Sequence, residues 1–81
     1  MLAINDIKVG KVYGIDFQTP SGMRWVEYKR EPVLVLQKHS TKDLIKVLTD
    51  NGLAYIAKAK DLNEWNKTIP DTLKNNPIYN A

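Results

Sequence analysis

Apolar and polar positions change their pattern most clearly between residues 44 and 57. Two apolar runs that contain β-branched residues flank the polar triplet Asp50-Asn51-Gly52. Such a triplet between two strand-like runs is the strongest short-range signal for a β-hairpin. The pattern predicts strands at about 44–49 and 53–59, and it predicts a positive φ angle at Gly52.

Two upstream segments also have strand character. In residues 11–17 apolar positions alternate so that Tyr13, Ile15 and Phe17 share one face, and Gly14 indicates a bulge or a close backbone approach. Residues 23–30 alternate less regularly, and Pro32 is expected to end or edge that strand. Residues 33–37 begin with four successive apolar positions, which is typical of a central strand covered on both faces.

Toward the carboxyl terminus the spacing of apolar residues changes from the alternation of a strand to that of a helical turn. Asp61 and Glu64 have the spacing of a capping box, and Leu62 and Trp65 fall on one side of a helical turn. We therefore expect one or two helical or 3₁₀ turns, with Leu62 and Trp65 plugging the end of a barrel, and another short turn from Asp71. Residues 1–73 are expected to form one domain, and residues 74–81 a loosely ordered tail.

Short strands separated by turn signals favour a small barrel over an open sheet. The order of these elements resembles the SH3-like small-barrel group, which includes SH3, Tudor and KOW domains. The resemblance covers roughly residues 7–66 and implies an all-β antiparallel barrel of four or five strands with a short C-terminal helical segment. The acidic first-loop cluster and the Trp pair of signalling SH3 domains are missing, so proline-rich recognition is not implied. The residues that carry the resemblance are Val9-Gly10-Lys11-Val12-Tyr13, residues 33–36, 44–48 and 50–52, and residues 55–62.

Length and composition fit one small domain. The chain has 81 residues, no Cys and a formal net charge of +3. The absence of Cys fits a cytoplasmic protein better than a small secreted one. No secretory signal pattern precedes the first strand, and the longest apolar run, residues 33–36, is too short to cross a bilayer. The sequence therefore predicts a soluble cytoplasmic protein with no membrane association.

Catalytic and metal-binding signatures are not found in the sequence. His39 is the only His, and it lies beside Ser40 in a polar loop without a third orienting group. One His without Cys does not supply a zinc site, and no Gly-rich loop precedes a helix. We expect a protein without enzymatic activity, metal or cofactor.

Cationic and aromatic side chains alternate between residues 24 and 30, a mixture that suits nucleic acid because cations meet phosphates and rings stack on bases. The same pattern fits a charged edge strand with Trp25 or Tyr28 in the core. Two functions compete: a protein-binding regulator or inhibitor, whose small size also suits a virus-encoded protein, and a nucleic-acid-binding module. Self-association as a homo-oligomer also fits a small basic barrel. The predicted binding surface comprises Arg24, Trp25, Tyr28, Lys29, Arg30, Lys38 and Lys42.

Overall fold

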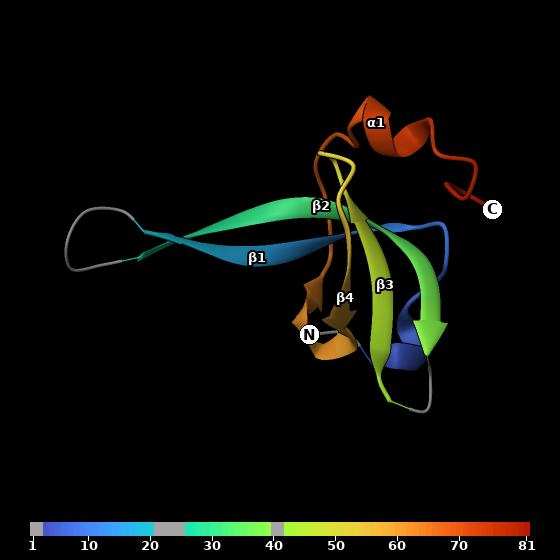
Figure 1. Cartoon of the computed structure of the whole chain (residues 1–81), viewed down its shortest axis with the longest axis horizontal. Coiled ribbons are helices and arrows are strands. Elements are labelled where there is room, and N and C mark those ends of the chain that lie inside the picture. The colour runs from blue at the N-terminus through green and yellow to red at the C-terminus, as the bar shows by residue number, and fades with distance from the viewer. Residues whose placement is uncertain (1–2, 21–25, 40–41) are drawn as a thin grey trace.

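One antiparallel sheet forms most of the molecule (Figure 1). The computed structural model describes residues 3–20, 26–39 and 42–81, apart from the side chains of residues 18–20, 26 and 27. The sheet has five strands in the order β4-β3-β2-β1-β5. The elements are the 3₁₀ turn η1 (Ile4–Asp6), β1 (Val12–Pro20), β2 (Val26–His39), β3 (Leu44–Thr49), β4 (Ala54–Lys58), the 3₁₀ turn η2 (Ala59–Asp61), β5 (Leu62–Asn63) and the helix α1 (Asp71–Lys74).

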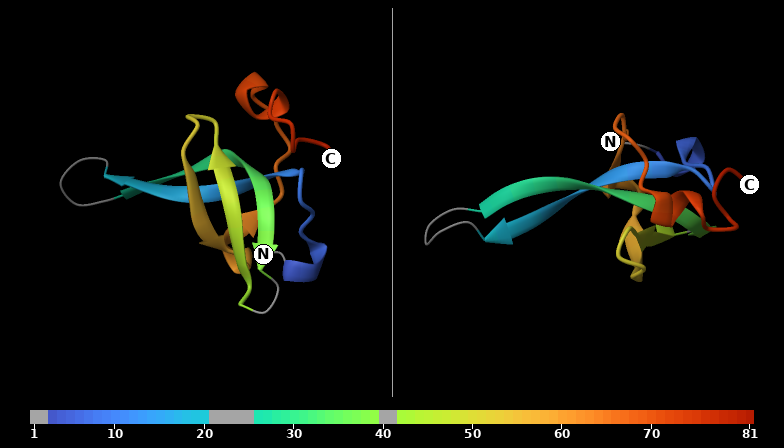
Figure 2. Two further views of the ribbon diagram at one scale, coloured as in Figure 1. Left: turned by 45° about the vertical axis from the view of Figure 1, so that its right-hand side comes forward. Right: turned by 90° about the horizontal axis from the view of Figure 1, so that it is seen from above.

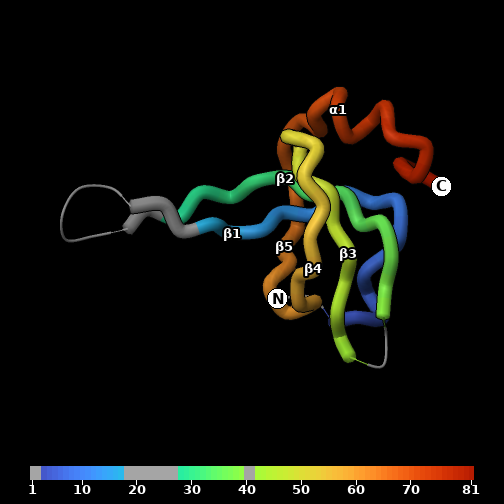
Figure 3. The backbone as a smooth tube through the Cα atoms, in the orientation of Figure 1, coloured from blue at the N-terminus to red at the C-terminus, as the bar shows by residue number. Residues whose placement is uncertain are grey.

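The predicted all-β antiparallel class is confirmed, but the predicted closure into a barrel is wrong. Strands β4 and β5 are the two edges of the sheet, and they are not paired with each other. β5 has only two residues and pairs with β1 at Gly14 and Ile15 (Figure 3). Such a short strand cannot bridge the two edges, so the sheet stays open.

The predicted hairpin between β3 and β4 is confirmed. Gly52 has φ +84°, and its N–H donates to the carbonyl oxygen of Thr49 at 3.0 Å. The Leu53 N–H donates to Oγ1 of the same threonine at 3.2 Å. The turn is a three-residue loop that ends in a left-handed glycine, a conformation in which glycine has no Cβ to clash.

Of the two alternatives predicted for Pro32, that it ends the strand is wrong, because β2 runs through it, whereas a position at an unpaired edge is confirmed. The Val35 N–H donates to the Lys11 carbonyl at 3.1 Å, so the backbone groups of Val35 face β1. Backbone groups alternate between the two sides of a strand, so the nitrogen of Pro32 faces the β3 side. β3 begins to pair with β2 only at Val33, so the missing N–H of Pro32 leaves no gap in the ladder.

The inner face of the sheet carries the larger core. Tyr13 is buried there, and its hydroxyl accepts from the Lys8 N–H at 2.9 Å and donates to the Asp6 carbonyl at 3.4 Å. These bonds satisfy the polar end of an otherwise apolar side chain. The buried residues of this core are Ile7, Tyr13, Ile15, Val33, Val35, Ile45, Val47, Ala57, Ala59 and Leu62.

The outer face of the sheet is covered by the C-terminal segment. Leu73 of α1 is fully buried against Val12 and Leu34, and Trp65 and Tyr79 pack around them. Burial on both faces of β2 was predicted from its continuous apolar run, and it is confirmed. The prediction that Trp65 plugs a barrel end is wrong, because it lies in this second core.

The C-terminal turns differ partly from the predicted ones. The 3₁₀ turn lies at residues 59–61 and β5 follows it directly, so Asp61 ends a turn and the predicted capping box of Asp61 and Glu64 is not formed. The turn predicted from Asp71 is confirmed as α1. The division at residue 73 stays a prediction, although the last residues contact the turn before β1: the Asn80 N–H donates to the Gly10 carbonyl at 2.7 Å.

The hairpin of β1 and β2 extends well beyond the other strands (Figures 1 and 2). We call residues 16–20 and 26–30 the arm, in which Asp16 pairs with Arg30 and Pro20 with Val26. β5 pairs with β1 no further than Ile15, and β3 pairs with β2 no further than Val33. Within the described backbone, the arm is therefore a two-stranded ribbon with both edges open, and it lengthens a molecule with axes of 42 × 30 × 21 Å.

Candidate protein-binding groove

The predicted binding surface does not form one described patch. Arg24 and Trp25 lie outside the described residues. Tyr28 is 67% exposed on the arm, whereas Lys38 lies near the opposite end of β2 and Lys42 lies beyond that end. The described members of the predicted surface are thus split between two ends of the molecule.

Two cations of the arm are engaged by carboxylates of the same chain. Arg30 Nε and Nη2 donate to the two carboxylate oxygens of Asp16 at 2.7 and 3.0 Å. This hydrogen bond lowers the pKa of Asp16 below its ordinary value of 3.8. Lys29 Nζ lies 3.3 Å from Glu31 Oε1. Both cations are thereby less available to an anionic ligand.

Gly14 makes the position of Arg30 possible. A Cβ atom at Gly14 would lie 2.8 Å from Cδ and 2.9 Å from Cγ of Arg30. The aliphatic part of the Arg30 side chain therefore crosses β1 at Gly14, where there is no side chain in its way. The close approach predicted for Gly14 is confirmed.

Lys38 has a structural contact rather than a place on a binding surface. Its Nζ donates to the carbonyl oxygen of Ile7 at 2.7 Å and to that of Ile4 at 3.4 Å. These carbonyls belong to the N-terminal segment that closes one end of the inner core. Lys38 therefore ties this segment to β2.

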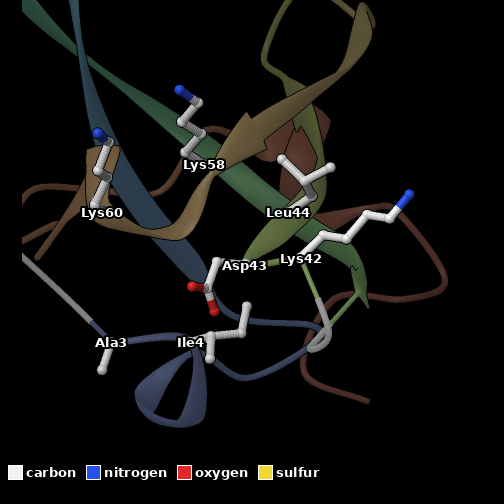
Figure 4. Close-up of a pocket in the computed structure, with 7 residues that line it drawn as sticks. All are labelled: Ala3, Ile4, Lys42, Asp43, Leu44, Lys58 and Lys60. Carbon is white, nitrogen blue, oxygen red and sulfur yellow. The ribbon is translucent and has the colours of Figure 1, made fainter.

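Lys42 borders an open hollow of about 630 Å³ at the end of the sheet that carries η1 (Figure 4). Three lysines line it, and in the close-up the side chains of Lys58 and Lys60 point in a similar direction, whereas that of Lys42 points to the other side. The carboxylate of Asp43 lies among these residues. Exposed lysines whose ammonium groups do not meet, beside a carboxylate, do not form a convergent anion site. The lining residues are Ala3, Ile4, Lys42, Asp43, Leu44, Lys58 and Lys60.

A second hollow, of about 730 Å³, lies where the arm leaves the body. Residues of β1 and β2 form one wall, and the β3–β4 turn and the start of β4 form the other. We call it the root groove. Its lining residues are Phe17, Lys29, Glu31, Thr49, Asp50, Asn51, Leu53 and Tyr55.

The root groove combines apolar side chains with charged ones. The rings of Phe17 and Tyr55 meet edge to face, with centroids 6.2 Å apart and an interplanar angle of 63°. Leu53 is 67% exposed, so its side chain remains available for contact. Lys29, Glu31 and Asp50 add charged groups to this apolar lining. A hollow that combines apolar and aromatic side chains with polar groups is typical of a binding site.

The hydroxyl of Tyr55 differs from that of Tyr13. It is buried and has no hydrogen-bond partner among the described residues. Burial also raises the pKa of Tyr55 above its ordinary value of 10.0. An unsatisfied buried hydroxyl destabilises the folded state. Buried polar groups without a hydrogen-bond partner are expected mainly at functional sites.

Sequence reasoning missed the root groove. It placed Phe17 on a strand face with Tyr13 and Ile15, and it gave no binding role to Asp50 or Leu53. Leu53 carried the one available signal, because it is a large apolar residue next to a polar turn. The other residues meet through the register of β1 with β2 and the fold of the β3–β4 turn, which composition does not specify.

Comparisons with family models, with curated proteins and with solved structures gave no match for this chain. Within residues 3–20, 26–39 and 42–81, no three His, Cys, Asp or Glu side chains gather in a way that would hold a metal ion. In the same part of the chain, no helix is long and apolar enough to cross a membrane.

Proposed function

We propose that the protein is a non-catalytic protein-binding module that regulates or inhibits its partner. The root groove receives an exposed segment of that partner. The observation that carries the proposal is the joining of exposed Leu53 with the Phe17–Tyr55 ring pair in one hollow beside a projecting arm. Exposed apolar groups surrounded by polar ones are a common mark of protein interfaces.

We also propose that the fold is an open relative of the SH3-like group and that the protein acts in the cytoplasm. The β1–β4 meander, with the short β5 returning to the side of β1, supports the first statement. The absence of Cys supports the second.

The test starts from a random-peptide display library selected on the immobilised full chain, with an unrelated protein as a selection control. Affinities of the enriched peptides are then measured by fluorescence anisotropy. Leu53→Asp places a charge in the root groove, and we expect affinity to fall about tenfold or more. Ile56→Asp is the matched control, because Ile56 is 52% exposed and lies outside the groove lining.

Both variants must first retain the melting temperature of the native chain to within a few degrees. Selective loss of binding in Leu53→Asp supports the proposal. An equal loss in both variants, no loss in Leu53→Asp, or no enrichment over the unrelated protein contradicts it.

Nucleic-acid binding is the second candidate, and one observation favours it: Lys42, Lys58 and Lys60 gather around one hollow. Against it, the arm cations Lys29 and Arg30 are paired with Glu31 and Asp16. A gel shift with mixed-sequence DNA and RNA at low salt separates the candidates. Retardation that disappears in a Lys42→Glu, Lys58→Glu double variant supports this second function, and no retardation excludes it.

A further inference from the structure

This inference rests on the proposed function and concerns how the partner segment is held. We propose that the segment binds as an added β-strand along the open edge of β2 at Arg30. It continues the line of β3 beyond the end of that strand. Its side chains on the inner face enter the root groove, and one of them is a lysine or arginine that faces Glu31 and Asp50.

The position next to β2 becomes vacant where β3 ends. The last pair of the two strands is Val33 with Thr49, and β3 then enters its turn. The Thr49 N–H donates to the Leu53 carbonyl at 2.8 Å, so its backbone groups face β4. Beyond this point, no strand borders the β3 side of β2 within the described residues.

The backbone of Arg30 faces this vacant position. Val35 directs its N–H and carbonyl toward β1, through bonds with Lys11 and Gly10. Backbone groups in a strand alternate, and no register shift separates Arg30 from Val35 in the pairing of β1 with β2. The N–H and carbonyl of Arg30 therefore point away from β1. These two groups can pair with an added strand, which obtains its affinity from main-chain hydrogen bonds.

The root groove lies on the side of the sheet that such a strand would use. Lys29 and Glu31 alternate with Arg30, and both line the groove together with Phe17. Alternate side chains of an added strand would project to the same side and meet the exposed Leu53. Main-chain pairing and side-chain recognition would then occur together, as in other strand-addition complexes.

The charges of the groove determine the polar part of the segment. The groove contains two carboxylates, of Glu31 and Asp50, and one ammonium group, of Lys29. Lys29 already pairs with Glu31, whereas Asp50 has no ion pair among the described residues. The net charge of the whole chain is +3, so this hollow has a local sign opposite to the rest. At physiological salt the screening length is about 8 Å, so nearby carboxylates outweigh distant lysines.

Amide hydrogen exchange of the full chain tests the strand, using the display-selected peptides as probes. The Arg30 amide should exchange rapidly in the free protein and slow about tenfold or more at saturating peptide. The Gln18 amide is an internal control, because by the same alternation it faces the other edge of the arm, beyond the last pair of β1 with β5 at Ile15. Protection at Arg30 but not at Gln18 supports strand addition. No change at Arg30, or equal protection of both amides, overturns it.

N-methylation of the peptide provides a second measurement. Methyl groups on one set of alternate amides should weaken binding about tenfold or more, and methyl groups on the other set should have little effect. A matched pair of variants tests the charge: Asp50→Asn should weaken binding about fivefold, and Asp61→Asn, outside the groove, less than twofold. Equal effects of the two methylation sets, or of the two variants, contradict the proposed mode.

These outcomes remain separate from those of the proposed function. Peptides that lose affinity in Leu53→Asp but show no protection at Arg30 would leave the root groove as the site and overturn only strand addition. Peptides that are indifferent to Leu53→Asp would overturn the groove itself.

Discussion

The body and the arm are built from the same two strands but are stabilised differently. In the body, β1 and β2 are covered on both faces, by the inner core and by the C-terminal segment. In the arm, the same strands continue as a ribbon whose described side-chain contacts include the exposed ion pairs of Arg30 and Lys29. Burial therefore fixes the body, whereas the arm has open backbone edges and a groove at its root. Under the proposed function, stability and recognition are divided along the length of one hairpin.

Removing Leu73 should have the largest effect, because it tests whether the C-terminal segment is part of the body. Leu73 is fully buried, and Leu73→Ala should lower the free energy of unfolding by about 2–5 kcal/mol. Ile56→Ala, at an exposed position of β4, should cost less than about 1 kcal/mol. Urea denaturation measures both, and equal losses would show that the segment does not belong to the core.

Alanine substitutions at two glycines with positive φ distinguish the cost of backbone strain from the cost of a steric clash. Gly10 and Gly52 have φ angles of +88° and +84°. A Cβ at Gly10 would lie 2.6 Å from the Ile78 carbonyl oxygen, whereas one at Gly52 meets nothing within 4 Å. Gly52→Ala should cost about 1 kcal/mol, and Gly10→Ala about 2 kcal/mol or more. If urea denaturation gives equal losses, the contact between the C-terminal residues and Gly10 is wrong.

The two tyrosines of the inner face should respond in opposite directions to loss of the hydroxyl. Tyr13→Phe removes a satisfied hydroxyl and should destabilise by about 1 kcal/mol. Tyr55→Phe removes an unsatisfied one and should stabilise by about 1 kcal/mol. Thermal melts distinguish the signs, and a destabilised Tyr55→Phe would mean that this hydroxyl has a partner in the free protein.

The ion pair of the arm should have the smallest effect on stability. The folded pKa of Asp16 is lowered, so its contribution is present above the unfolded value near 3.8 and is lost as pH falls through the folded value. Because the pair is exposed, this contribution is small. In Asp16→Asn, the decline of the melting temperature below about pH 4 should be slightly shallower than in the native chain. An identical acid profile would show that the pair adds nothing to stability.

The sequence predicted those parts of the fold that local patterns determine. Asp50-Asn51-Gly52 identified the β3–β4 hairpin, and the apolar run at residues 33–36 identified a strand covered on both faces. Barrel closure could not be judged, because the length of β5 depends on contacts far apart in the chain. Whether Pro32 would end its strand or lie at an edge stayed open, because this depends on which side of β2 its nitrogen faces. The root groove was not predicted, because it forms only where β3 ends beside the arm, and the sequence does not show where that is.

Chemical-shift mapping with a display-selected peptide tests the central claim most directly, namely that recognition occurs at the junction of body and arm. The amide resonances of ¹⁵N-labelled protein are followed during titration with the peptide. The account predicts the largest shifts at Phe17, Arg30, Asp50, Leu53 and Tyr55, which lie in or beside the root groove, and small shifts at the lysines around the other hollow. The largest shifts at Lys42, Lys58 and Lys60, with the root groove unchanged, would contradict it.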